Sequence, residues 1–373
     1  MQDRMDGFES LPQVPLGRSG KQCSRLALGG FHQLEISSEH VADVVEAYFA
    51  EGGNYIETAR DYGQGASEEK IGKAIEGRRD QVVLCSKTSA ATADQLRADL
   101  ELTLKALRTD RLDFYFFHCV DHEKLQAITA PGGALEAMSQ AIDQHVIGGI
   151  GFSSHQPEVY LEALGRLDLS LILVWLNYLD NLNFPIIPDR VLPEARQRGV
   201  GVTAMKPLAD GLLYRSVRSA VAYCLGAGAE VMVCGTNSVQ HVHELAEAVR
   251  NGPADADQRH RMLAEAPELG TYVCRRCGRC GPDLMEVFRL EGMYDRQMMD
   301  FVPRNPADHA LRRLLSGWFH LEKAACREYL GKGFDAGRLA DQAKRATCPY
   351  GIDLPRKLRI AAAKLSGQSP QAV

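Results

Sequence analysis

Short apolar runs alternate along the first 250 residues with segments in which apolar residues recur every three or four positions. The runs predict eight strands, at residues 25–31, 54–59, 81–87, 112–120, 147–155, 171–178, 199–207 and 230–238. The intervening segments, such as 38–52, 92–107 and 134–146, carry acidic residues early and apolar residues at helical spacing, which predicts helices. Eight strand-then-helix units predict an α/β fold, a parallel (β/α)8 TIM barrel.

This alternation stops near residue 251, where the segment NGPADADQRH has the composition of a turn-rich boundary. Beyond about residue 265 the chain shows no alternating strands. We therefore predict two domains, a barrel over residues 1–255 and a mostly helical domain over residues 265–373.

Charge and composition exclude several classes of protein. The 373 residues carry a formal net charge of -5, so nucleic acid is not expected as a partner. The N-terminal segment MQDRMDGFESLPQVPLG has no apolar centre, and no run of 18 apolar residues occurs. We therefore expect a cytoplasmic protein without a membrane partner. Ten cysteines in a chain of this length are too sparse for a disulfide scaffold.

Polar groups of complementary chemistry follow three successive predicted strands. The loops at the carboxyl ends of barrel strands carry the chemistry in this fold, and these ends offer Glu57, Tyr62, Lys87 and His118. A tyrosine has an ordinary pKa of about 10, but an adjacent ammonium favours its phenolate and makes it a better acid. We expect Glu57 to hold Lys87, and His118 to hydrogen-bond a carbonyl oxygen that receives the proton. Any one of these groups alone is more often a hydrogen-bonded interior residue, whereas the four together favour a proton-donating site.

Six segments arrive in a recognisable order: GGNYIETARDYG, SEEKIGKAI, VLCSKT, RLDFYFFH, IGGIGFSSH and GVTAMKPLADG. They resemble the successive motifs of the aldo/keto reductase family, over about residues 14–250. The resemblance implies a barrel that uses NAD(P)H to reduce a small-molecule carbonyl, or oxidises the alcohol. It also implies that Tyr62 is the general acid, Lys87 its activator, His118 the group that orients the substrate and Glu57 the partner of the lysine. Glu57 stands where the family usually has aspartate.

The same resemblance implies a nucleotide site. The residues expected to hold the nicotinamide are Ser153, Ser154, Met205 and Lys206, and those expected to hold the adenosine and phosphates are Gly235, Thr236, Asn237, Gln240 and Glu244. Many members that use NADP carry a basic residue near position 237, and this chain does not. NADP and NAD are therefore equally expected.

A run of cysteines with two-residue spacers lies at Cys274, Cys277 and Cys280. Bacterial ferredoxin sites use the run C-x2-C-x2-C-x3-C-P, in which the fourth cysteine of one run serves the other cluster. Here the run's own fourth position is leucine, while a lone Cys-Pro pair survives at Cys348. These four cysteines complete one ligand set and predict a single 4Fe-4S cluster. The segment resembles a family branch with a C-terminal ferredoxin-like 4Fe-4S segment, including GIDLP just after the Cys-Pro pair.

Other readings of the cysteines stay open. Four thiolates also suit tetrahedral zinc, and Cys326 is an alternative fourth ligand that lacks the following proline. The cluster either ties its domain together or relays electrons to a redox partner protein, for which Arg275, Arg276 and Arg279 would form a cationic face. Hydride transfer moves two electrons and one cluster normally carries one, so the cluster is not an obvious part of the reductase step. A second function class also stays open, because Glu57 and Ser154 stand where the family usually has aspartate and asparagine. It is a nucleotide-sensing or electron-transfer subunit on a barrel with little turnover.

Overall fold

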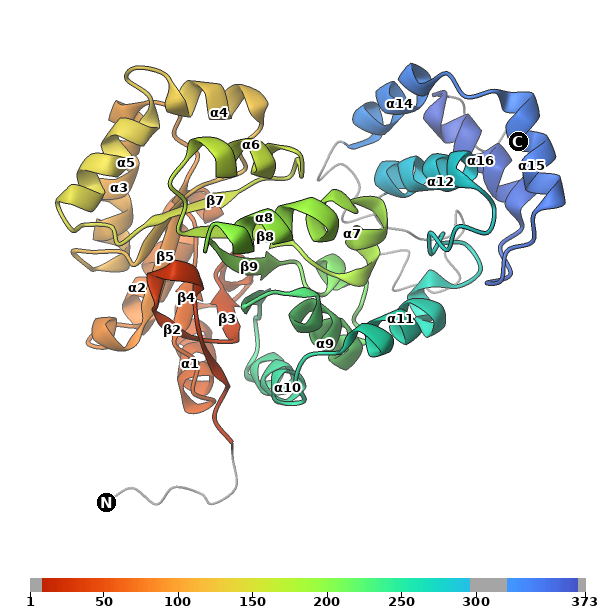
Figure 1. Ribbon diagram of the computed structural model, residues 1–373. Coiled ribbons are helices and arrows are strands. Elements are labelled where there is room, and N and C mark those ends of the chain that lie inside the picture. The colour runs from red at the N-terminus through yellow and green to blue at the C-terminus, as the bar shows by residue number, and fades with distance from the viewer. Residues whose placement is uncertain (1–8, 296–320, 368–373) are drawn as a thin grey trace. The chain divides into compact units, whose positions relative to one another are not determined.

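Residues 9–295 and 321–367 are described by a computed structural model (Figure 1). Contacts divide the chain into two compact units. The first contains the chain up to residue 176 together with residues 186–207 and 224–253, and the second contains residues 177–185, 208–223 and 254 onward. The division into domains at 1–255 and 265–373 stays a prediction.

The first unit is a closed barrel of eight parallel strands. The strands are β3 (Leu26–Gly29), β4 (Tyr55–Glu57), β5 (Val83–Thr88), β6 (Phe114–Phe117), β7 (Ile150–Ser153), β8 (Leu171–Trp175), β9 (Gly201–Met205) and β10 (Val231–Gly235). Their order around the barrel follows the chain, and β10 pairs with β3 to close it. All eight predicted strands and the predicted TIM barrel are confirmed.

Register places the carboxyl ends of neighbouring strands on one rim. Glu57, the last residue of β4, pairs with Cys85 of β5, and Lys87 pairs with Phe116 of β6. Successive side chains of a strand point to opposite faces, so every second residue turns into the barrel. Polar residues that follow the buried apolar runs of β4, β5 and β6 are thereby collected on this rim.

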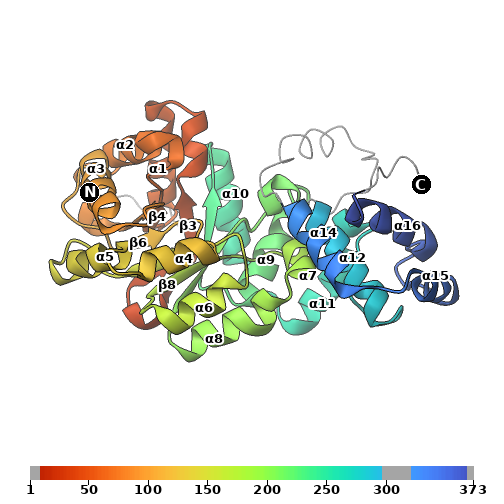
Figure 2. The same cartoon turned by 90° about the horizontal axis from the view of Figure 1, so that it is seen from above.

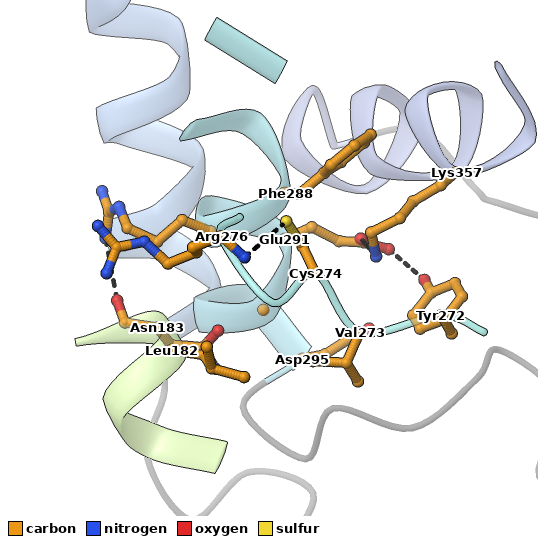
Figure 3. Close-up of a pocket in the computed structure, with 12 residues that line it drawn as sticks. Leu182, Asn183, Tyr272, Val273, Cys274, Arg276, Phe288, Glu291, Asp295 and Lys357 are labelled. Carbon is orange, nitrogen blue, oxygen red and sulfur yellow. Dashed lines mark hydrogen bonds and ion pairs between the residues drawn. The ribbon is translucent and has the colours of Figure 1, made fainter. Parts of the chain in front are cut away.

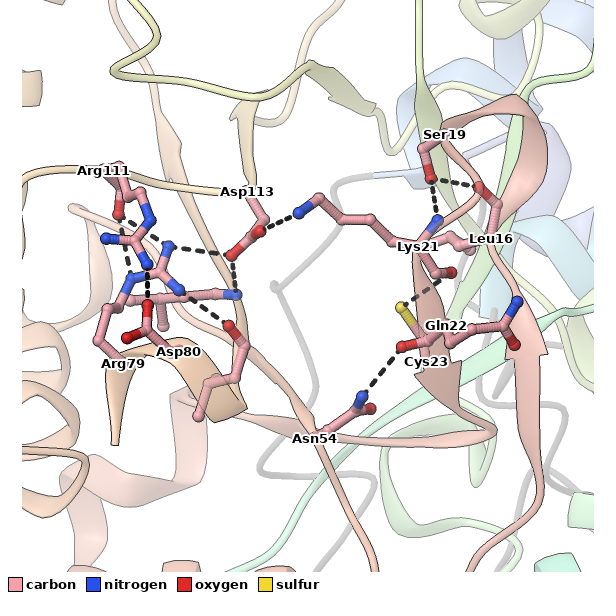
Figure 4. A network of polar contacts seen from close by, with 12 residues as sticks. Leu16, Ser19, Lys21, Gln22, Cys23, Asn54, Arg79, Asp80, Arg111 and Asp113 are labelled. Atoms are coloured by element: carbon pink, nitrogen blue, oxygen red, sulfur yellow. Dashed lines mark hydrogen bonds and ion pairs between the residues drawn. The ribbon is translucent and has the colours of Figure 1, made fainter. Parts of the chain in front are cut away.

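A short antiparallel hairpin, β1 (Gln13–Pro15) with β2 (Gln22–Ser24), precedes the barrel. Its Leu16 and Cys23 are buried in the same apolar core as the barrel strands. Lys21 Nζ lies 2.5 Å from Asp113 Oδ1 just before β6, and Asp113 also accepts from the Arg79 guanidinium at 2.9 Å (Figure 4). The hairpin is therefore held to the barrel by both apolar packing and an ion pair.

Amphipathic helices surround the strands (Figures 1 and 2). They are α1 (Ser38–Ala50), α2 (Ala66–Ala74), α3 (Ala93–Leu107), α4 (His122–Thr129), α5 (Ala134–Asp143), α6 (Val159–Arg166), α8 (Leu192–Gln197) and α10 (Val239–Arg250). The predicted helices at 38–52, 92–107 and 134–146 are confirmed as α1, α3 and α5. Side-chain caps explain where helices begin: Thr92 and Gln95 form a capping box at the start of α3.

The second unit is helical. Its elements are α7 (Tyr178–Asn183), the first part of α9 (Val217–Ala227), α11 (Ala256–Glu265), α12 (Pro282–Asp295), α14 (Leu321–Lys332), α15 (Ala336–Arg345) and α16 (Leu354–Leu365). Leu284 and Phe288 of α12 pack with Leu339 of α15 and Leu358 of α16 in its core. The predicted helical C-terminal region is confirmed for the residues that are described. Within those residues, none of the helices combines the length and apolarity needed to cross a bilayer.

Candidate functional site

Glu57 and Lys87 form a buried ion pair on the rim of the barrel. Lys87 Nζ lies 2.8 Å from Glu57 Oε1, and the residues are 1% and 2% exposed. Lys87 also donates to the Thr58 carbonyl oxygen at 2.9 Å. Burial is the largest single influence and would lower the pKa of Lys87, but the charges and hydrogen bonds of Glu57 and Tyr62 together outweigh it and raise that pKa above its ordinary value. Lys87 is therefore a fixed cation, and the longer glutamate does reach it.

Tyr62 begins the 3-10 helix η3 (Tyr62–Gly65) that follows β4. Lys87 Nζ lies 5.0 Å from the centroid of the Tyr62 ring. The Tyr62 and His118 rings meet edge to face, with centroids 5.7 Å apart. Burial raises the pKa of Tyr62, the Lys87 ammonium lowers it and Glu57 raises it, and the balance lies above 10. The lysine thus acts in the expected direction, yet it offsets only part of the effect of burial.

His118 follows β6 and is hydrogen-bonded to a carboxylate that sequence reasoning missed. Its Nδ1 lies 3.0 Å from Asp61 Oδ2, and the same oxygen accepts from Ser89 Oγ at 2.5 Å. The hydrogen bond from His118 is the main cause that lowers the pKa of Asp61 to about 2. Burial lowers the pKa of His118, while Asp61 opposes that change. The only signal in the sequence was a carboxylate directly before Tyr62.

The two serines expected at the nicotinamide are already engaged with the backbone. Ser153 ends β7, and its Oγ accepts from the Cys119 amide at 3.2 Å. Ser154 Oγ donates to the Val120 carbonyl oxygen at 2.6 Å and accepts from the Gln156 amide at 2.9 Å. A hydroxyl has one proton and two lone pairs, so these serines retain acceptor capacity more than donor capacity.

Met205 and Lys206, also expected at the nicotinamide, lie at the end of β9. Lys206 has φ +54°, a left-handed conformation that is uncommon for a residue with a side chain. Strained backbone of this kind concentrates at functional sites. On the same rim, the His155 ring stacks on Trp175 at the end of β8, with centroids 5.2 Å apart. This aromatic pair was not predicted.

Two buried polar atoms lie at the start of the segment expected to hold the adenosine and phosphates. Gly235 ends β10, and Thr236 follows it and is buried. Gln33, also buried, donates from Nε2 to the Thr236 carbonyl oxygen at 2.6 Å. Gln33 Oε1 and Thr236 Oγ1 have no hydrogen-bond partner among the described residues. Buried polar atoms are normally satisfied, so this pair fits a site that a polar ligand completes.

The rest of the segment expected to hold the adenosine and phosphates lies among carboxylates. Asn237 Nδ2 donates to Glu35 Oε2 at 2.7 Å, and Gln240 Nε2 donates to Glu244 Oε1 at 2.8 Å. Burial would raise the pKa of Glu35, but hydrogen bonds from His32 and Asn237 lower it below its ordinary value. An ionised carboxylate therefore adjoins Asn237, where a cation would favour the 2′-phosphate of NADP.

The second unit brings the four predicted cluster cysteines near one another. The pKa of Cys280 is raised to about 11, mainly by burial, and Cys274, Cys277 and Cys348 lie close enough to contribute to that rise. Cys280 is 6% exposed in the apolar core, and Cys274 and Cys348 pack against that core. Cys277 is exposed. Cys326, the alternative ligand, is instead within 3.6 Å of the Lys364 carbonyl oxygen.

The loop of the first three cysteines has the backbone of a tight turn. Gly278 and Gly281 have φ of +83° and +86°, and Arg276 has φ +54°. The Arg276 amide donates to Cys274 Sγ at 3.4 Å. Backbone N–H bonds to sulfur are typical of iron-sulfur sites. Among the residues described, however, no three His, Cys, Asp or Glu side chains stand in an arrangement that would hold a metal ion.

Buried charges adjoin Cys274. A small cavity of about 10 Å³, room for one water molecule, is lined by Cys274, Tyr272, Glu291 and Lys357 (Figure 3). Lys357 Nζ lies 2.5 Å from Glu291 Oε2 and 3.8 Å from the centroid of the Tyr272 ring. The Lys357 charge also acts to lower the pKa of Cys274, against the larger effect of burial, which raises it. The loop is thus supported by an ion-pair network as well as by the apolar core.

The three arginines of the loop have different surroundings. Arg275 donates to the Val273 carbonyl oxygen at 2.7 Å and lies over the Tyr350 ring, 4.8 Å from its centroid. Arg276 and Arg279 are exposed. Any cationic face for a partner is therefore formed by Arg276 and Arg279, while Arg275 supports the loop.

Comparison with known proteins agrees with this geometry. The sequence model of the aldo/keto reductase family matches residues 25–248. The uncharacterized oxidoreductase YqkF of Bacillus subtilis is 26% identical over 210 residues, covering 53% of this chain and 65% of that protein. L-glyceraldehyde 3-phosphate reductase of Escherichia coli is 26% identical over 218 residues, covering 53% and 61%. The chain thus spans less than two thirds of the length of these two relatives.

A solved structure shows the same fold. The aldo-keto reductase of Klebsiella pneumoniae in complex with NADPH is 25% identical, with a TM-score of 0.56, covering 68% of this chain and 94% of that one. The family model ends at residue 248, before the cysteines of the second unit, so it does not bear on them.

Proposed function

Because this chain belongs to the aldo/keto reductase family, we propose that it transfers a hydride between NAD(P)H and a small-molecule carbonyl compound, or in reverse from the alcohol. The observation that carries the proposal is the meeting of Glu57, Tyr62, Lys87 and His118 on one rim, around a buried ion pair of 2.8 Å. If these four groups lay far apart in the folded chain, they could not act together in proton transfer. Together they place a charged lysine beside a half-buried phenol.

The roles follow from the contacts. Tyr62 donates its phenolic proton to the carbonyl oxygen, and the Lys87 ammonium, 5.0 Å from the ring centroid, stabilises the phenolate that remains. Glu57 keeps Lys87 charged and holds its side chain in place. Bound nicotinamide supplies the hydride. Phe31, whose ring centroid is 5.2 Å from that of Tyr62, adds an apolar neighbour beside the phenol.

The barrel is suited to hold the nucleotide. Gln33 Oε1 and Thr236 Oγ1 are buried and have no hydrogen-bond partner among the described residues. Lys206, whose backbone is strained, lies where the nicotinamide is expected to bind. The NADPH complex of the Klebsiella relative supports NADP as the cofactor. The ionised Glu35 beside Asn237 favours NAD at the same time, so both nucleotides belong in the assay.

The test is oxidation of NADPH and of NADH against a panel of aldehydes and ketones by anaerobically purified protein. Tyr62→Phe should bind either nucleotide normally, as measured by quenching of protein fluorescence, and lose turnover. Tyr214→Phe, at an exposed tyrosine, is the matched control and should keep it. Failure of the native protein to consume either nucleotide with any member of the panel, or equal turnover in Tyr62→Phe, would contradict the proposed chemistry.

For the second unit we propose one 4Fe-4S cluster held by Cys274, Cys277, Cys280 and Cys348. Three observations support this proposal. The other three cysteines lie close enough to Cys280 to raise its pKa, and the Arg276 amide donates a hydrogen bond to Cys274 Sγ. The spacing of the cysteines is also ferredoxin-like. The donor set, four thiols and no other ligand, fits iron-sulfur or zinc, and the arrangement tightens when the metal binds because small metal sites fold around the metal. A cluster beside the exposed Cys277 requires a reducing compartment, which supports a cytoplasmic protein.

The cluster experiment is independent of turnover. Iron, sulfide and zinc are measured after anaerobic expression with ample iron. About four iron and four sulfide per chain are expected for one cubane. Colourless protein with one zinc per chain would contradict the cluster and leave the reductase proposal intact. Exposed Arg276 and Arg279 make an acidic redox protein the partner to test, since opposite charges steer such encounters.

A further inference from the structure

The contact between Asp61 and His118 has a consequence for the chemistry at the rim. Asp61 precedes Tyr62 directly, and its side chain makes no capping hydrogen bond to η3. Its Oδ2 accepts from Ser89 Oγ at 2.5 Å and lies 3.0 Å from His118 Nδ1. The Asp61 carboxyl is ionised at neutral pH, because its pKa is lowered to about 2. An ionised carboxylate has no proton to donate, so the proton in this hydrogen bond belongs to Nδ1 of the histidine.

From this geometry we infer that Asp61 is a positioning residue: it holds the single proton of neutral His118 on Nδ1 and leaves Nε2 as an acceptor in the site. The inference rests on the proposed reductase function and refines the role of His118. Neutral His118 then accepts a hydrogen bond at Nε2 from the hydroxyl of an alcohol. It cannot donate one there to a carbonyl oxygen, as we expected from the sequence. Only the imidazolium form carries a proton on both nitrogens.

The charges around His118 decide which form is present. Burial, the Lys87 ammonium on β5 and the Lys124 ammonium on α4 each lower its pKa, and only Asp61 raises it. Their sum lies below the ordinary value of 6.5. The other ionisable neighbours are Tyr62, whose ring meets that of His118, and Cys119, the next residue along the chain. Both are neutral near pH 7 because burial raises the pKa of each.

The sign of the pH dependence follows. Above the pKa of His118 the neutral ring accepts at Nε2 and suits the alcohol, so alcohol oxidation should rise as pH rises through that pKa. Below it the imidazolium donates at Nε2 and suits the carbonyl, so reduction should gain as pH falls. Nδ1 stays bonded to Asp61 in both forms, because the Asp61 pKa of about 2 lies far below this range.

The decisive measurement is the tautomer itself. Full-length, anaerobically prepared protein labelled with 15N-histidine is examined by long-range 1H–15N correlation at pH 8, and the His118 signals are found by difference from His118→Gln. We expect a protonated Nδ1 and a bare Nε2. A proton on Nε2 instead would overturn the inference, with or without a substrate in hand.

Variants of Asp61 supply the functional readout. Asp61→Val removes the acceptor and should release the Nδ1 tautomer, flatten the pH profile of alcohol oxidation and lower kcat roughly 100-fold without raising KM for the nucleotide. Asp61→Asn keeps an acceptor without the charge, so it should retain the tautomer, lower the His118 pKa further and recover part of kcat. Asp94→Asn, an exposed carboxylate at the start of α3, is the charge-matched control and should behave as the native protein.

The possible failures are separable. A protonated Nδ1 in protein that turns over no substrate refutes the reductase proposal and leaves the tautomer assignment standing. Turnover with a protonated Nε2, or an unchanged pH profile in a folded Asp61→Val protein, refutes the positioning role alone. If Asp61→Val does not fold, the native spectrum and Asp61→Asn still decide the question.

Discussion

Removing Glu57 from the buried pair should cost stability and activity in separable amounts. Glu57 and Lys87 are 2% and 1% exposed, and the lysine also donates to the Thr58 carbonyl oxygen at 2.9 Å. Glu57→Gln therefore leaves a buried ammonium with neutral acceptors only and no counter-ion. Breaking a buried pair in this way typically costs about 3–5 kcal/mol. Because the hydrogen bond from Lys87 to the Thr58 carbonyl oxygen remains, we expect a loss at the lower end of this range, about 3 kcal/mol of unfolding free energy.

The double variant tests whether the charge is the cause. Lys87→Met should cost a similar amount, since it strands the Glu57 carboxylate. Glu57→Gln combined with Lys87→Met buries no charge, so most of the lost stability should return. Activity should not return, because Tyr62 has lost its ammonium. Restored stability without restored turnover is the expected signature.

The assay follows the barrel alone. The chain has two tryptophans, and in a Trp318→Phe background the remaining one, Trp175 of β8, reports the unfolding of the barrel in urea. Arg18→Ala, which breaks an exposed ion pair with Asp168, is the control and should cost less than about 1 kcal/mol. A loss below about 1 kcal/mol for Glu57→Gln, or no recovery in the double variant, would refute the reasoning.

The pH dependence of the pair gives an independent check. The pKa of Lys87 is raised in the folded state, so its contribution to stability is complete below the ordinary lysine value of about 10.4. It is lost as pH rises through the higher folded value, because the unfolded chain releases the proton first. The native protein should lose stability in that window, and the Lys87→Met variant should lose less.

Three further outcomes are expected. Tyr62→Phe should lower kcat by about two to four orders of magnitude with little change in nucleotide binding, and equal rates would remove the phenol from the mechanism. Cys348→Ser should lower iron content as strongly as Cys277→Ser, whereas Cys326→Ser should not, and loss of iron in all three would point to misfolding instead. Glu35→Gln should improve kcat/KM for NADPH relative to NADH by about tenfold, which a pair of nucleotide titrations would decide.

The barrel could be predicted from the sequence because each strand and helix is marked by a pattern of neighbouring residues. A strand such as Phe114–Phe117 needs only a short apolar run, and a helix such as Ala93–Leu107 needs only spacing and a cap. Eight repeats of that alternation leave few folds to choose from. The polar residues of the rim could be predicted for the same reason, since each follows a recognisable strand.

The sequence did not predict the hairpin β1–β2, nor which residues belong to the second unit. Residues 177–185 and 208–223 read as loops and helices of the barrel, yet their contacts are with the C-terminal helices. Tyr178, for instance, donates to Glu268 at 3.0 Å, across 90 residues of chain. Contacts between residues so far apart leave no periodic trace in the sequence.

In the candidate site, too, the sequence predicted which residues come together, whereas their protonation depends on the folded structure. The pattern of strands and polar residues was sufficient to assemble Glu57, Tyr62, Lys87 and His118, because parallel strands end on one rim wherever the barrel closes. The sequence could not give the balance of forces on these groups. Burial outweighs Lys87 at Tyr62, and Asp61 turns the proton of His118 away from the site. Desolvation and the direction of a hydrogen bond depend on what surrounds a group in three dimensions, so only the folded chain decides them.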